Sequence, residues 1–166
     1  MPVLTILEHP DPRLRQRSAP VDVFDAEVRQ LADDLLETLY ATSGIGLSAP
    51  QAGVHRRVAV MDLSGSASDP QVFVNPEIRS RAAFGIVEES CLSVPGVTGN
   101  VWRATKVKVR AQDCTGHAIE RDLEGMEAVC LQHEVDHLDG KLFIDRLWFF
   151  RRLMLRLNIA RQGKAA

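Results

Sequence analysis

Apolar residues recur at three- and four-residue intervals near the amino-terminal end of the chain. The members of this series are Val28, Leu31, Ala32, Leu35, Leu36 and Leu39. Such spacing is typical of the buried face of an amphipathic helix. Asp25 is suited to cap its first turn and Gly44 to stop it. The pattern therefore predicts a helix from Ala26 to about Thr42.

Between residues 57 and 124 the pattern changes to short runs of β-branched residues separated by turn residues. The predicted strands are 58–63, 72–75, 87–94, 105–111 and 118–123. In the fourth run valine alternates with lysine and arginine, which places the valines on one face and the cations in water. Residues 113–116 form a hairpin turn into the fifth run, so antiparallel pairing is favoured. The Ser-rich stretch 64–70 is predicted to be a surface loop.

Helical patterns return at residues 126–138, which Gly125 and Gly140 bracket, and from Asp145 to about Gln162. A helix, a set of strands and two further helices predict an α+β fold. We expect a single domain over residues 1–166, in which antiparallel or mixed β-sheets pack around the central helix at 126–138. An amino-terminal and a carboxy-terminal helix complete it.

The composition suits a globular domain in a reducing compartment. Of 166 residues, 45% are hydrophobic and 25% charged, and the odd number of cysteines, 3, argues against a disulfide framework. The chain has no run of ~20 apolar residues, and its first 20 residues contain Glu8, Asp11 and 4 prolines. Neither a membrane span nor a signal or transit peptide is predicted. The cytoplasm is the expected location.

Charge is distributed unevenly along the chain. Residues 146–166 contain 6 basic residues and no acidic one, whereas the rest has 14 basic against 22 acidic residues, a charge of −8. An acidic body argues against nucleic-acid binding by the whole domain, but a basic terminal helix could bind an RNA-containing partner. A solvated helix face beside an acidic body is the alternative.

The predicted helix at 126–138 contains the sequence H-E-x-x-H. In a helix, His133 and His137 lie on one face about 6 Å apart and could share one divalent ion, with Glu134 directed toward its bound water. A solvated helix that carries these residues by chance is the alternative. A hydrolytic site usually has a third protein ligand. Cys130 lies too far along the helix and is interpreted as pocket wall or core, Cys114 falls in the predicted hairpin turn, and Cys91 follows a strand that could face the helix.

Three blocks and two further motifs follow one another along the chain. The blocks are GIGLSAPQ at 44–51, ESCLS at 89–93 and QHEVDH at 132–137, and the motifs are HPD at 9–11 and NPE at 75–77. In this order they resemble the polypeptide (peptide) deformylase family over nearly the whole chain. The resemblance implies a hydrolase that removes the formyl group from N-formylmethionyl nascent peptides and releases formate.

The resemblance also implies a metal centre and a set of site residues. Cys91 joins His133 and His137 as the third ligand, and the family's metal is Fe²⁺, with Zn²⁺, Ni²⁺ or Co²⁺ as occupants after purification. Glu134 is the implied general base, and the backbone N–H of Leu92 and the amide of Gln51 are the implied oxyanion donors. The implied substrate-binding residues are Gly44, Ile45, Gly46, Val87, Glu89, Met126, Val129 and Cys130. Without Cβ atoms, Gly44 and Gly46 would let an extended peptide approach the backbone.

Two positions depart from the family pattern. Ser48 replaces an alanine, and Ser90 replaces the glycine that usually precedes the cysteine. If Ser90 needed a positive φ, the strain would cost on the order of 1 kcal/mol or displace Cys91 and Leu92. Ser90 therefore favours one alternative, a metal-retaining binding module with little turnover. A small zinc endopeptidase is the other, although no third His or Glu stands at a protease-like spacing.

The resemblance gives the basic terminal helix a candidate partner. Related enzymes use such a helix, here 146–166, to bind the ribosome, where phosphates attract Arg and Lys. Its apolar stripe would contain Leu147, Phe150, Leu153, Met154 and Leu157. We expect a monomer or a weak dimer.

Overall fold

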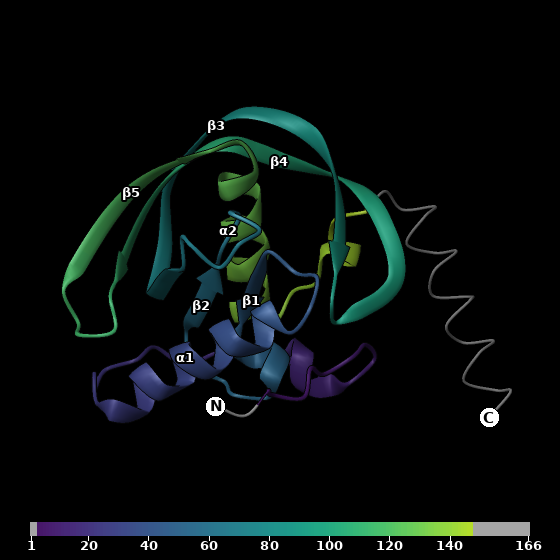
Figure 1. The fold of residues 1–166 in the computed structure, drawn as a ribbon. Coiled ribbons are helices and arrows are strands. Elements are labelled where there is room, and N and C mark those ends of the chain that lie inside the picture. Colours follow the sequence, from purple (N-terminus) through teal and green to yellow (C-terminus); the bar gives the residue numbers. More distant parts are fainter. Residues whose placement is uncertain (1–2, 148–166) are drawn as a thin grey trace, which may run out of the picture.

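One antiparallel sheet forms the framework of the computed structural model, which describes residues 3–147. Its strands follow one another in chain order: β1 (Gly46–Ser48), β2 (Val58–Met61), β3 (Gln71–Cys91), β4 (Val94–Gln112) and β5 (Ala118–Glu124). Helix α1 (Ala26–Tyr40) packs against β1 and β2, while the long β3–β4 hairpin arches around α2 (Gly125–Leu138) (Figure 1). The predicted single-domain α+β fold with antiparallel strand pairing is confirmed.

Helix α1 begins where the sequence predicts. The Asp25 carboxylate accepts hydrogen bonds from the backbone N–H groups of Glu27 and Val28, which satisfies two of the free donors of the first turn. The helix ends at Tyr40, two residues before the predicted end. Its buried residues include four of the predicted apolar face: Val28, Ala32, Leu35 and Leu39.

Helix α2 is buried on all sides over most of its length. Every residue from Ala128 to Leu138 is buried, and the helix contacts all five strands. The H-E-x-x-H sequence therefore lies in the interior, where polar side chains need partners. This placement concentrates five polar or charged side chains of the helix in a small buried volume: Gln132, His133, Glu134, Asp136 and His137.

Strands β3 and β4 are much longer than the sequence predicts. The predicted strands 72–75 and 87–94 mostly belong to the single strand β3, which is irregular at Asn75 and near Ser80. Residues 79–84 are all exposed, so they show no alternation of apolar and polar side chains. Without that alternation, the sequence does not predict the middle of the strand. The three-residue strand β1 was not predicted because it is too short to show a period.

The predicted helix from Asp145 to Gln162 does not begin at Asp145. Residues Phe143–Arg146 form a 3-10 helix, one of three in the described chain with Pro12–Arg15 and Ala49–Ala52, and Leu147 is extended. Leu147 is buried against Gly99 in a cluster with Leu14 and Phe143. The rest of the predicted helix lies outside the described residues. No helix among residues 3–147 is both long and apolar enough to cross a membrane.

Candidate metal centre

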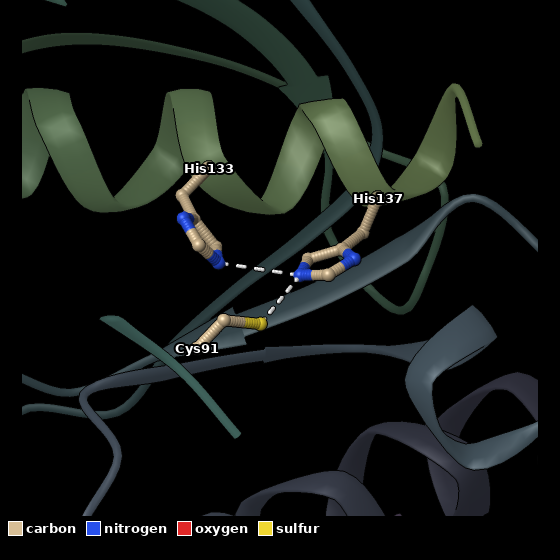
Figure 2. Close-up of side chains that lie close together, drawn as sticks. All are labelled: Cys91, His133 and His137. Atoms are coloured by element: carbon tan, nitrogen blue, oxygen red, sulfur yellow. Dashed lines mark hydrogen bonds between the residues drawn. The ribbon is translucent and has the colours of Figure 1, made fainter. Parts of the chain in front are cut away.

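Three nitrogen and sulfur donors from two elements converge in the interior. His133 and His137 lie one turn apart on α2, and Cys91 is the last residue of β3 (Figure 2). His137 Nε2 lies 3.2 Å from Cys91 Sγ and 3.2 Å from His133 Nε2, and the three donor atoms are within 4.8 Å of one another. Two imidazoles and one thiol at this spacing suit a four-coordinate divalent metal whose last position is open.

The protonation of the two histidines is set by their surroundings. Burial holds the pKa of His137 well below its usual value, so this ring is neutral, as a ligand must be. Burial also lowers the pKa of His133, but hydrogen bonds to Cys91 and Glu89 outweigh it and raise that pKa to about 10. A metal that binds here therefore displaces the proton on His133 Nε2.

Glu89 holds the other nitrogen of His133. Its Oε2 lies 2.8 Å from His133 Nδ1, and Arg103 donates two hydrogen bonds to the carboxylate. Burial raises the pKa of Glu89, but the hydrogen bonds from His133 and Arg103 prevail and lower it to about 2. The ionised carboxylate keeps the proton on Nδ1 and directs Nε2 toward Cys91 and His137.

Glu134 lies beside the donor cluster and is buried. Its Oε2 has no hydrogen-bond partner among the described residues. An orphaned buried carboxylate oxygen is costly, so it points to a proton donor or bound group that occupies this place in the working protein. Burial raises the pKa of Glu134 to about 7, which suits a group that accepts and returns a proton near neutral pH.

The Gln51 side chain is fixed at both ends. Its carbonyl oxygen accepts hydrogen bonds from the backbone N–H and the hydroxyl of Ser48, each at 2.9 Å. Its amide nitrogen donates to Ser93 Oγ at 3.2 Å and lies 3.7 Å from Cys91 Sγ. Ser48, one of the two departures from the family pattern, thus orients the amide group toward the cysteine.

A cavity of about 410 Å³ opens beside the donor cluster. Its lining includes most of the predicted site residues: Gly44, Ile45, Gly46, Gln51, Glu89, Cys91, Leu92, Met126, Val129, Cys130, His133 and Glu134. His137 is almost fully buried and does not line it. Val87, a predicted pocket residue, is half-buried and does not line it either. Ile45 and Met126 are 39% and 48% exposed, as expected for apolar residues at the mouth of a binding site.

The glycine at position 46 has a packing role in addition to the expected one in substrate approach. A Cβ atom there would lie 2.6 Å from Cys130 Sγ and 2.8 Å from Glu134 Oε1. Neither Gly44 nor Gly46 has a positive φ. Gly46 therefore allows β1 to pack closely against α2 beside the catalytic candidates, in addition to lining the cavity.

The remaining cysteines are not part of the donor cluster. Cys130 is buried in the cavity wall with its Sγ 3.7 Å from the carbonyl oxygen of Ile45, and burial raises the pKa of its thiol well above the usual value. This position agrees with its interpretation as pocket wall. Cys114, which falls in the predicted hairpin turn, is partly buried against the cluster around α1.

The strain considered for Ser90 is absent. Ser90 does not have a positive φ; within residues 3–147 the non-glycine residues that do are Ala67, Asn75 and Ala83. The serine therefore carries no conformational penalty of the kind that would displace Cys91 or Leu92. The backbone at Ser90 therefore does not favour a metal-retaining binding module with little turnover.

Several residues around the site were not predicted from the sequence. Arg103 and Asp136 form a buried ion pair that reaches Glu89, Ser93 contacts Gln51, and Ser43, Glu88, Ser90 and Pro95 line the cavity. The position of Arg103 in its strand could have indicated the buried ion pair. Arg103 shares the inward positions of its strand with Val101, Val107 and Val109, and an arginine at such a position needs buried acidic partners.

Comparison with known proteins identifies the family to which this chain belongs. The family model for polypeptide deformylase matches residues 3–152. Peptide deformylases from Pseudomonas aeruginosa and Alkalilimnicola ehrlichii are 50% and 49% identical to this chain, over 99% of the chain and 98% and 94% of those proteins. The solved structure of a Legionella pneumophila peptide deformylase is 43% identical, with a TM-score of 0.91 and coverage of 99% and 97% of the two chains. That from Thermotoga maritima is 38% identical, with a TM-score of 0.84 over 89% and 99%. The chain belongs to the polypeptide deformylase family.

Proposed function

We propose that Cys91, His133 and His137 hold the metal ion with which this deformylase removes the formyl group from N-formylmethionyl peptides. One observation carries the proposal: a buried, partly unpartnered carboxylate, Glu134, adjoins three converging metal donors at the wall of a peptide-sized cavity. A divalent ion in such a site lowers the pKa of water and polarises a carbonyl oxygen.

The chain's own residues perform the proton transfers. Glu134 accepts a proton from the attacking water and later delivers it to the departing amine of methionine. Its pKa of about 7 allows both steps near neutral pH. The products are formate and a peptide with a free amino-terminal methionine.

The charge that develops on the formyl oxygen needs donors already in place. We assign this role to the side-chain amide of Gln51 and the backbone N–H of Leu92, the residue that follows Cys91. The hydrogen bonds from Ser48 keep the Gln51 carbonyl oxygen directed away, so the amide nitrogen faces the cysteine end of the site. The cavity residues Ile45, Met126 and Val129 supply apolar surface for the methionine side chain.

We further propose that the working metal is Fe²⁺. The thiolate of Cys91 beside a redox-active ion would make the site sensitive to oxygen. Protein reconstituted anaerobically with Fe²⁺ should release formate faster than protein loaded with Zn²⁺, and it should lose activity on exposure to air while the zinc form does not. Metal analysis and a formate assay on the same samples measure both effects. Equal rates for the two metals, or an air-stable iron form, would contradict the assignment.

The cytoplasm is the proposed location, with residues 1–166 as a single catalytic domain that is a monomer or a weak dimer. The proposed additional partner is the ribosome, bound through the basic segment. Five of its cations lie at residues 148–166: Arg151, Arg152, Arg156, Arg161 and Lys164. Arg146 and Leu147 are excluded because they belong to the folded body.

Deletion of residues 148–166 is expected to abolish co-sedimentation with ribosomes at low salt, because phosphate contacts dominate such binding. Peptide deformylation by the deletion variant should remain unchanged. A full-length control with Arg151, Arg152 and Arg156 changed to glutamine separates charge from chain length and should also lose binding. Failure of the full-length protein to bind, or binding that survives both changes, would refute a role for the segment.

A further inference from the structure

A continuous chain of charged groups joins the end of the folded body to the metal centre. Arg146 donates hydrogen bonds from Nε and Nη2 to the two oxygens of Asp136, both at 2.5 Å. Arg103 donates to Asp136 at 2.6 Å and, through Nε and Nη2, to both oxygens of Glu89 at 2.6 and 3.0 Å. Glu89 in turn contacts His133 Nδ1 at 2.8 Å. Four direct contacts therefore link Arg146 to a metal ligand.

Arg103 is shared between two buried carboxylates. Its side chain is 2% exposed, and those of Glu89 and Asp136 are 4% and 7% exposed, so each charge depends on protein partners. Arg146 also neutralises Asp136, through both carboxylate oxygens. Because Arg146 compensates the charge of Asp136, the Nε and Nη2 groups of Arg103 remain free to donate to Glu89. Without Arg146, the uncompensated Asp136 would draw Arg103 toward itself. The hydrogen bonds from Arg103 to Glu89 would then weaken.

We propose that Arg146 is a positioning residue for the metal centre, acting through Asp136 and Arg103 on Glu89, which orients His133. The inference rests on the proposed ligand set, Cys91, His133 and His137. Partners that orient metal-binding histidines commonly affect metal affinity although they never touch the ion.

Arg146 is the most solvent-exposed member of this chain of charged groups. Its side chain is 41% exposed, whereas the other charged members of the chain are almost fully buried. It is also the last cation before residues 148–166, which carry the other five cations of the basic end of the chain. The metal centre is therefore sensitive to any change at the surface that removes Arg146 from Asp136.

Full-length Arg146→Ala and Arg146→Lys proteins, loaded with Co²⁺, test the inference without a turnover assay. Chelator competition gives the Co²⁺ dissociation constant, and visible absorption reports the geometry around the ion. Arg146→Ala should raise the dissociation constant about threefold to tenfold and shift the absorption bands, less than the roughly 10- to 100-fold typical of a direct partner of a ligand. Arg146→Lys, which keeps the charge, should recover part of the affinity.

The matched control is Arg57→Ala. Arg57 donates to Asp139 at 2.8 Å and to the carbonyl oxygen of Leu138, so its loss removes an arginine–aspartate pair at the end of the same helix. Neither of these contacts involves Glu89 or His133. Arg57→Ala should leave Co²⁺ affinity and absorption unchanged, whatever its effect on Tm.

A double-mutant cycle identifies the route. In a Glu89→Gln background, Arg146→Ala should add little to the loss of affinity, because both changes act through the same carboxylate. Unchanged Co²⁺ binding in Arg146→Ala, an equal change in Arg57→Ala, or fully additive effects with Glu89→Gln would overturn the inference. If the wild-type protein bound no Co²⁺, or Cys91→Ser bound it equally well, the ligand set itself would fail, and the inference with it.

Discussion

Replacing Glu134 with glutamine is expected to reduce deformylation by about 10²- to 10⁴-fold, the usual contribution of a general acid–base group. Glutamine has nearly the same shape but cannot accept a proton from water or return one to the amine. Glu134 is buried and its pKa is raised by that burial, so its loss should not destabilise the fold. Steady-state kinetics with formyl-Met-Ala-Ser, together with metal analysis, measure the effect. Metal content should stay at the wild-type level.

Glu127→Gln is the control for this substitution. Glu127 lies in the first turn of the same helix, where its carboxylate accepts a hydrogen bond from Gln71, and it does not line the cavity. Glu127→Gln should therefore leave turnover close to the wild-type rate. A Glu134→Gln protein that retained a tenth or more of the wild-type rate, outside the roughly 10²- to 10⁴-fold loss expected, would exclude the general-base role.

Replacing Cys91 with serine should remove both metal and activity. The thiolate is the sulfur donor of the cluster, 3.2 Å from His137 Nε2, and a serine hydroxyl is a far weaker ligand at neutral pH. Because loss of an outer partner alone costs roughly 10- to 100-fold in metal affinity, loss of a ligand should cost more than about 100-fold. Chelator competition and a formate assay measure the two losses.

Cys130 provides an internal control for that experiment. It is buried, lines the same cavity and stands one turn before His133, but its Sγ faces the carbonyl oxygen of Ile45. Cys130→Ser should therefore retain bound metal. Equal metal loss in both cysteine variants would mean that the site depends on thiol packing, and unchanged metal in Cys91→Ser would eliminate the proposed third ligand.

The ligand helix could be predicted because its signal is local. The spacing of His133, Glu134 and His137 follows from the period of a helix, and the flanking glycines mark its ends. The resemblance to a family then selected Cys91 among three cysteines. Geometry alone left that choice open, because whether a strand end faces a helix is a property of the tertiary fold.

The supporting groups could not be predicted because their partners are remote in the sequence. Glu89, Arg103 and Asp136 meet only when β3 pairs with β4 and α2 packs inside the hairpin. Glu89 was expected to contact substrate, and the structure also gives it a direct contact with His133. Gly46 was expected to serve substrate approach, yet its close packing depends on where Cys130 and Glu134 lie.

The central claim is that this metal centre hydrolyses the formyl group of N-formylmethionyl peptides, and formate release under anaerobic conditions tests it most directly. Iron-loaded wild-type protein should convert formyl-Met-Ala-Ser to equal amounts of formate and Met-Ala-Ser, and chelator-treated protein should produce neither until Fe²⁺ is restored. Formate release that does not depend on metal, or cleavage of the Met–Ala peptide bond in place of the formyl group, would contradict the account.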